Sequence, residues 1–87
     1  MSLSQLSVGA GSGDSGISIF SGSSSISRLM FADGTSGGSE YDGFVAYEHS
    51  NQKLGIGVAG TGGYSLAIGS SGNVGIGDSN PQHPLRS

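Results

Sequence analysis

Glycine interrupts this chain so often that a long helix cannot form in it. The 18 glycines among 87 residues leave no Gly-free stretch longer than eleven residues, and only residues 23–33 and 44–54 reach that length. Each Gly costs a helix about 1 kcal/mol relative to Ala, and isolated helices shorter than about 12–15 residues are marginal in water. The Gly spacing therefore predicts an all-β or irregular chain without helices.

Short apolar clusters alternate with Gly- and Ser-rich segments along the chain. Most clusters show the two-residue alternation of a half-buried strand, and the segments between them have the composition of turns. The sequence predicts seven short strands, at residues 6–8, 17–20, 26–31, 44–47, 54–58, 64–68 and 74–76. Such a series indicates a β-meander or a solenoid-like chain.

The domain organisation is simple. We expect one β-rich domain over residues 1–81, which begins with a Gly/Ser-rich entry segment at 1–16. Both prolines lie near the end, and residues 82–87 read as a Pro-containing C-terminal tail or linker. Residues 1–5 show no signal peptide, because a charged start and an apolar run are both missing.

Apolar residues are few for a chain that must fold alone. Leu, Ile, Val and Phe together make up 19 of the 87 residues, and there is no Cys. Small domains with so little apolar material need a further source of stability, and without disulfides or a metal that source is oligomerisation. We therefore expect an oligomer, with a single-chain β-solenoid or meander as the alternative architecture.

Several predicted strands have one aliphatic face and one bare face. Glycine alternates with aliphatic residues in 54–58 and 74–77, and Ala and Gly occupy that face in 66–69. Glycine inside a strand often marks the close approach of another backbone, so we expect the Gly faces to admit a neighbouring chain. The expected core between subunits consists of Leu54, Ile56, Val58, Leu66, Ile68, Val74 and Ile76.

The charge of the chain argues against two classes of partner. The net charge is −3 and only three residues are Lys or Arg, too few for the phosphate contacts that drive nucleic-acid binding. No apolar stretch approaches the 18 or more residues of a membrane span. We expect no nucleic-acid partner and no membrane insertion.

Two short motifs match catalytic or cofactor patterns by letter only. Residues 55–60 fit G-x-G-x-x-G, but the dinucleotide fingerprint needs a helix to open at the third Gly, and residues 61–63 are Thr-Gly-Gly. Residues 34–38 fit G-x-S-x-G, but a nucleophile elbow also leads into a helix, and none is expected after Gly38. We expect no cofactor and no enzymatic activity.

Polar candidates for a metal or a catalytic site are weak. Four acidic residues could supply oxygen ligands to Ca²⁺, but they lack EF-hand spacing, and Asp33 before a Gly is typical of a turn. In a trimer, His49 or His83 could lie beside its symmetry mates on the axis and hold a metal ion there. Paired carboxylates for glycan hydrolysis would have to come from Glu40, Asp42 and Glu48. The four acidic residues are Asp33, Glu40, Asp42 and Glu48.

Aromatic residues beside polar ones raise the alternative of carbohydrate binding. Tyr41, Phe44, Tyr47 and Tyr64 could form a surface on which sugars stack, although aromatic residues in strands more often fill a core. A carbohydrate-binding adhesin domain is therefore the second functional hypothesis. The candidate receptor contacts are Asp33, Glu40, Tyr41, Asp42 and Tyr47.

Two stretches resemble a known family. One runs from Arg-Leu-Met-Phe-Ala-Asp-Gly-Thr at 28–35 through Tyr-Glu-His-Ser-Asn at 47–51 to Leu-Gly-Ile-Gly at 54–57. The other is Ser-Ser-Gly-Asn-Val-Gly-Ile-Gly-Asp-Ser-Asn-Pro at 70–81. Together they are similar to bacteriophage tail-fibre and related virion appendage proteins, in the region that precedes a C-terminal intramolecular chaperone of the endosialidase (peptidase S74-like) type. The resemblance covers about residues 26–81.

The resemblance implies an intertwined parallel homotrimer at the end of a fibre, located on the virion or otherwise extracellular. It implies a non-catalytic structural role, contacts with other tail-fibre or virion proteins, and host attachment through a cell-surface glycan. The chain departs from the family at Asp78-Ser79-Asn80 and at Pro84, which interrupts an expected strand. The self-cleaving chaperone is absent, so no protease activity carries over.

Overall fold

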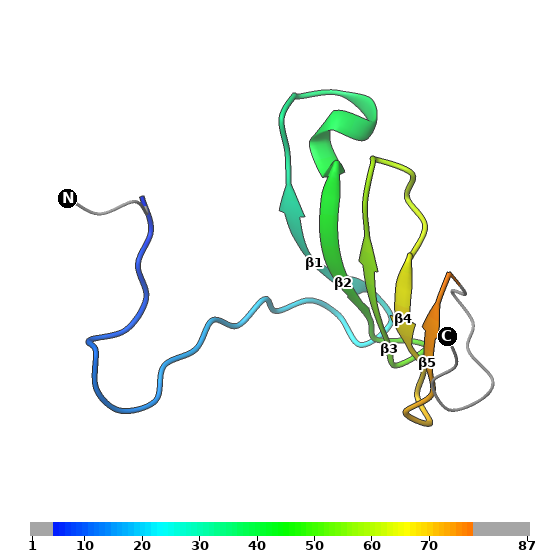
Figure 1. Ribbon diagram of the computed structural model, residues 1–87. Coiled ribbons are helices and arrows are strands. Elements are labelled where there is room, and N and C mark those ends of the chain that lie inside the picture. Colours follow the sequence, from blue (N-terminus) through cyan, green and yellow to red (C-terminus); the bar gives the residue numbers. More distant parts are fainter. Residues whose placement is uncertain (1–4, 78–87) are drawn as a thin grey trace.

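A computed structural model describes residues 5–77 of the chain. Five strands and one short 3₁₀ helix follow one another along it (Figure 1). The elements are β1 (Ile26–Phe31), η1 (Gly37–Tyr41), β2 (Gly43–Glu48), β3 (Lys53–Gly57), β4 (Leu66–Ile68) and β5 (Val74–Ile76). The expected tail at 82–87 lies outside the described residues.

The strands form one antiparallel sheet in the order β1-β2-β3-β4-β5. Each strand pairs with the next one in the chain, so the sheet is a meander, and the prediction of an all-β fold is confirmed. Solenoid coils stack their strands in parallel, and residues 5–77 contain no parallel pair. The clusters at 26–31, 44–47, 54–58 and 74–76 all lie in strands, with bounds shifted by one residue or less.

The connections explain why glycine is so frequent. In the β4–β5 turn, the Gly72 N–H donates to the Gly69 carbonyl, and Gly72 has a φ of +89°, a value that favours glycine. After β3 the chain turns back at residues 59 and 60, both with positive φ. There Gly60 lies against Gly38, close enough that a Cβ on Gly60 would come within 2.8 Å of the Gly38 carbonyl oxygen.

Two of the predictions about local structure were wrong. Element η1 begins at Gly37 and continues past Gly38, where no helix was expected; it is a five-residue 3₁₀ helix between β1 and β2. Residues 6–8 and 17–20 form no strand, because a strand needs a paired neighbour, and residues 5–21 extend away from the sheet past β1 (Figure 1). The radius of gyration of 15.2 Å accordingly exceeds the about 12 Å typical of a compact domain of this length.

Candidate functional site

One face of the sheet carries apolar side chains from every strand. Residues paired across antiparallel strands lie on the same face, and alternate residues lie on opposite faces. Register therefore places an aliphatic residue of each strand in a single row: Leu29, Val45, Ile56, Leu66 and Ile76. The neighbouring row consists of Ser27, Tyr47, Leu54, Ile68 and Val74.

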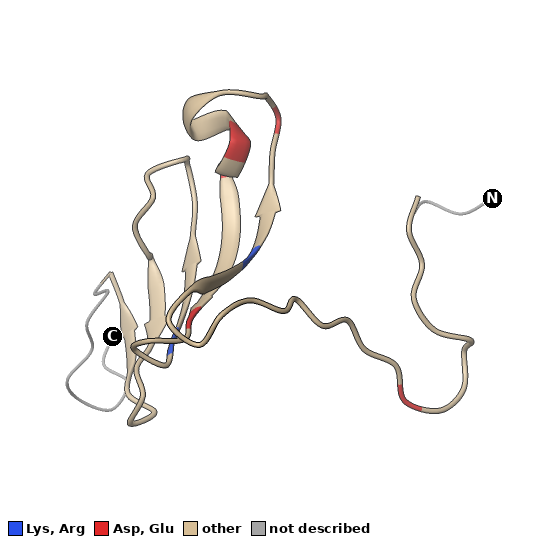
Figure 2. Ribbon diagram, turned by 180° about the vertical axis from the view of Figure 1, so that it is seen from behind, with Lys and Arg blue, Asp and Glu red and all other residues tan. Residues whose placement is uncertain are grey.

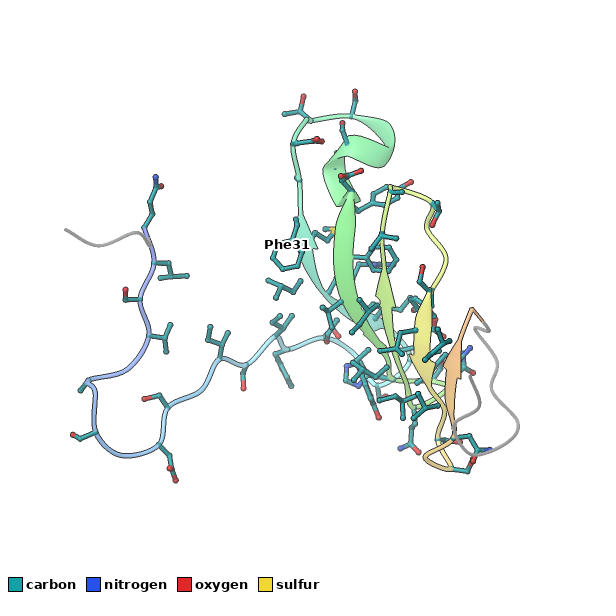
Figure 3. The ribbon with its side chains drawn as sticks, viewed as in Figure 1. Phe31 is labelled. Atoms are coloured by element: carbon teal, nitrogen blue, oxygen red, sulfur yellow. The ribbon has the colours of Figure 1, made fainter. Side chains whose placement is uncertain are left out.

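We call this surface the apolar face and include two residues at its end. Phe31 continues the alternation of β1 and projects from the strand in Figure 3. Phe31 and Val58 together line one shallow depression. All seven positions expected in an intersubunit core belong to this face. The apolar face thus comprises Leu29, Phe31, Val45, Tyr47, Leu54, Ile56, Val58, Leu66, Ile68, Val74 and Ile76.

No charged residue of a strand lies on the apolar face. The charged strand residues are Arg28, Glu48 and Lys53, and register places all three on the opposite side; most of the ribbon in Figure 2 carries no charge. The apolar face is only partly covered, since Leu29, Phe31 and Ile76 are 51, 59 and 63 % exposed. A contiguous apolar surface of this kind marks an interaction site.

The opposite face holds the small core of the chain. The buried hydrophobic residues among those described are Phe44, Ala46 and Ala67, and register puts all three on that side. Phe44 and the half-buried Tyr64 lie with their rings 6.0 Å apart. The chain therefore buries two alanines and one phenylalanine and leaves most of its large aliphatic residues in contact with solvent.

The Gly face of β3 was expected to admit a neighbouring chain, but side chains of the same chain cover it. The ring of Tyr64 covers Gly55, and the ring of Phe44 covers Gly57 together with the Gly63 carbonyl oxygen. A Cβ at either glycine would overlap these rings. The bare backbone thus accommodates aromatic side chains of the same chain, which corrects the sequence-based interpretation.

A groove of about 690 Å³ lies on this second face. We call it the tyrosine groove, because Tyr41 from η1 and Tyr64 from the β3–β4 loop both line it. Arg28, Glu40 and Lys53 add charged side chains of both signs. The groove combines aromatic rings with hydrogen-bonding groups, the general composition of a small-molecule site.

A hydrogen-bonded network closes one side of the tyrosine groove. The Tyr64 hydroxyl donates to Glu48 Oε2 at 2.5 Å, and Asn51 Nδ2 donates to Glu48 Oε1 at 2.8 Å. The bond from Tyr64, then that from Asn51, and the nearby charges of Lys53 and Arg28 lower the pKa of Glu48. Burial and the bond to Glu48 raise the pKa of Tyr64 to about 12.

We expect Tyr64→Phe to cost about 1 kcal/mol of unfolding free energy, the usual net value of a hydrogen bond. Because the pKa of Glu48 is lowered in the native state, the contribution of its carboxylate to folding stability is present above pH 4.5. This contribution is lost as the pH falls through the native pKa. Because the pKa of Tyr64 is raised in the native state, the contribution of its hydroxyl to folding stability is present below pH 10 and is lost as the pH rises toward 12.

An NMR titration of Glu48 measures this network directly. In Tyr64→Phe the pKa of Glu48 should rise toward 4.5, and the pH dependence of stability should weaken in both windows. Tyr41→Phe is the matched control, since it removes a phenol oxygen from the same groove and leaves the bond to Glu48 intact. An unchanged Glu48 pKa in Tyr64→Phe would contradict the assignment.

The five candidate receptor contacts do not form one surface. Glu40 and Tyr41 line the tyrosine groove, whereas Asp33 and Asp42 line the depression beside Phe31. Tyr47 lies on the apolar face, where its ring contacts that of His49 edge-on at 5.0 Å. None of the three tyrosines is fully buried.

The other polar candidates are equally dispersed. Glu40 and Glu48 line the tyrosine groove and Asp42 does not. His49 Nε2 lies 3.0 Å from Ser27 Oγ, and His83 is outside the described residues. Within residues 5–77, no group of three or more His, Cys, Asp or Glu side chains is arranged to hold a metal ion.

Sequence reasoning missed several members of both surfaces. Leu29, Phe31 and Val45 belong to the apolar face. The two-residue alternation of the clusters that contain them could have assigned them to it. Arg28 and Lys53 line the tyrosine groove. Nothing in the sequence links these two, because the groove brings together residues of β1, η1, β2, β3 and the β3–β4 loop.

Comparison with known proteins gives no match: no protein-family model fits the chain, and no curated protein or solved structure is significantly similar to it. Within the described part of the chain, no helix has the length and apolar character needed to cross a membrane.

Proposed function

We propose that this protein is a non-catalytic structural module that assembles into a homotrimer through its apolar face, as a segment of a phage tail fibre or similar virion appendage. The observation that carries the proposal is the distribution of apolar residues. A chain that buries Phe44, Ala46 and Ala67 has a small core of its own, while eleven residues of the apolar face remain available to other copies.

The energetics of that surface support the proposed assembly. Burial of a large apolar side chain is worth about 1.5–3 kcal/mol, and the absence of strand charges on this face removes the desolvation penalty that would oppose association. Identical chains with a shared apolar surface form closed symmetric oligomers. The choice of three chains and of the virion rests on the resemblance of the motifs within residues 26–81 to those of tail-fibre proteins, and not on the comparisons, which found no match.

Immunogold electron microscopy tests the virion assignment. An antibody against the recombinant chain should label the appendages of virus particles that encode it. Particles lacking the gene are the control and should bind no gold. Label on the capsid alone, or only inside host cells, would contradict the assignment.

The tyrosine groove supports a second candidate function, that of a carbohydrate-binding adhesin domain. Tyr41 and Tyr64 offer ring faces, and Arg28, Glu40 and Lys53 offer hydrogen-bonding groups. In the proposed oligomer this groove lies on the face that is not used for assembly. Binding would therefore be compatible with the structural role.

NMR titration with a panel of oligosaccharides tests this second function. A binding sugar should shift the resonances of Tyr41 and Tyr64 and leave that of Tyr47, on the opposite face, unchanged. Tyr41→Ala should abolish the shifts. No shift with any sugar of the panel, or shifts confined to the apolar face, would contradict it.

A further inference from the structure

The segment before β1 carries apolar side chains that its own chain leaves uncovered. We call residues 15–21 the arm. Ile17, Ile19 and Phe20 of the arm are 70, 49 and 99 % exposed. Three large apolar residues within four positions, one of them a fully exposed phenylalanine, are unfavourable in water unless a partner covers them.

The arm starts from the apolar face and leads away from its own sheet. Ser27, which register places on the apolar face, donates through Oγ to the Ile19 carbonyl oxygen at 3.0 Å and lies 2.7 Å from Ser21 Oγ. From there the chain runs outward past β1 in both views (Figures 1 and 2). The arm is thus attached to its own sheet at Ser27 and extends from there away from the strands.

We propose that the arm of each copy packs on the apolar face of the adjacent copy. The inference rests on the proposed homotrimer and specifies how its copies contact one another. Each chain has one arm and one apolar face, so in the proposed trimer each arm can pass to the next copy in turn, and such a head-to-tail contact closes into a ring when the rotation permits. A symmetric face-to-face pair would instead leave both arms exposed.

The composition of the arm fits this partner. It has no charged residue, and neither do the strand positions of the apolar face. Ile17 and Ile19 are two positions apart, the spacing that puts both side chains on one side of an extended segment. Gly9, Gly11 and Gly13 upstream have positive φ, which interrupts extended structure and limits the contact to the arm.

Substitution of the arm in the full chain is the first test. Phe20→Ser combined with Ile19→Ser should raise the concentration at which the oligomer dissociates by at least about tenfold, because two apolar side chains leave the interface. Leu6→Ser is the matched control: Leu6 is 76 % exposed but lies before the three glycines, and its loss should leave the dissociation concentration unchanged.

Cross-linking between copies is the second test, and the absence of Cys in the chain makes each introduced thiol unique. Copies with Phe20→Cys and isotopically heavy copies with Ile56→Cys are refolded together and treated with a short bismaleimide. Mass spectrometry should find mixed light–heavy products, which can only arise between copies. Leu6→Cys in place of Phe20→Cys should give none.

The outcomes separate this inference from the proposed function. If the wild type is oligomeric, the arm variant dissociates at the same concentration as the wild type and no mixed product forms, the docking of the arm is overturned. The proposed trimer is then unaffected. A wild type that is monomeric at all concentrations overturns both. If the wild type assembles, the arm variant dissociates at a higher concentration and mixed products form, the results support both the docking of the arm and the proposed oligomer.

Discussion

Ile56→Asp should convert the proposed trimer into a monomer that keeps its sheet. Ile56 is the middle residue of the aliphatic row that crosses all five strands. In the oligomer its replacement would bury an unpaired carboxylate, which costs on the order of several kcal/mol in each copy. In an isolated copy the position is 38 % exposed, so the charge can stay hydrated and the fold should survive.

Sedimentation velocity and circular dichroism together check this result. Ser70→Asp is the control, since it adds the same charge at an exposed turn position and should leave the sedimentation coefficient unchanged. Ile56→Leu should also assemble, because it keeps the apolar volume. An Ile56→Asp protein that sediments like the wild type would contradict the assignment of the apolar face.

Gly57→Ala should destabilise the fold itself, by about 1–3 kcal/mol. The added Cβ would overlap the Phe44 ring on one side and the Gly63 carbonyl oxygen on the other. Phe44 is one of the few buried side chains, and the Tyr64 ring lies 6.0 Å from it. The Gly63 carbonyl oxygen is backbone, so relief of the overlap needs a shift of the β3–β4 loop as well as a movement of the Phe44 ring.

Denaturant unfolding measures the effect, which is large against the 5–15 kcal/mol typical of a whole domain. Gly63→Ala is the matched control from the adjoining loop. A Cβ there meets no atom within 4 Å, so the change in unfolding free energy should stay within about 0.5 kcal/mol. Equal stability of the two variants would mean that Phe44 does not occupy the surface of Gly57.

Alternation in the sequence was sufficient to predict the strands of the sheet and most of the residues of the apolar face. In residues 54–58 and 74–76 every second residue is aliphatic, and a period of two assigns these side chains to one face before any pairing is known. The arm shows the limit of the same pattern. Ile17 and Ile19 alternate equally well, yet they form no strand, because pairing depends on a neighbour that the local sequence does not identify.

The tyrosine groove was beyond prediction for a related reason. A bare Gly face shows that something approaches the backbone closely, but it does not distinguish another chain from a ring of the same chain. Tyr64 reaches Gly55 and Glu48 through the conformation of the β3–β4 loop. In that loop Gly60 lies against Gly38, and its N–H donates to the Asp42 carbonyl oxygen. The sequence around both glycines suggests only flexible turns.

The molar mass of the wild-type protein in solution tests the central claim most directly. Light scattering across a range of concentrations should give three times the 8.6 kDa chain mass. A mass of one chain at every concentration would show that the apolar face is stable in water without a partner, and it would contradict the proposed assembly.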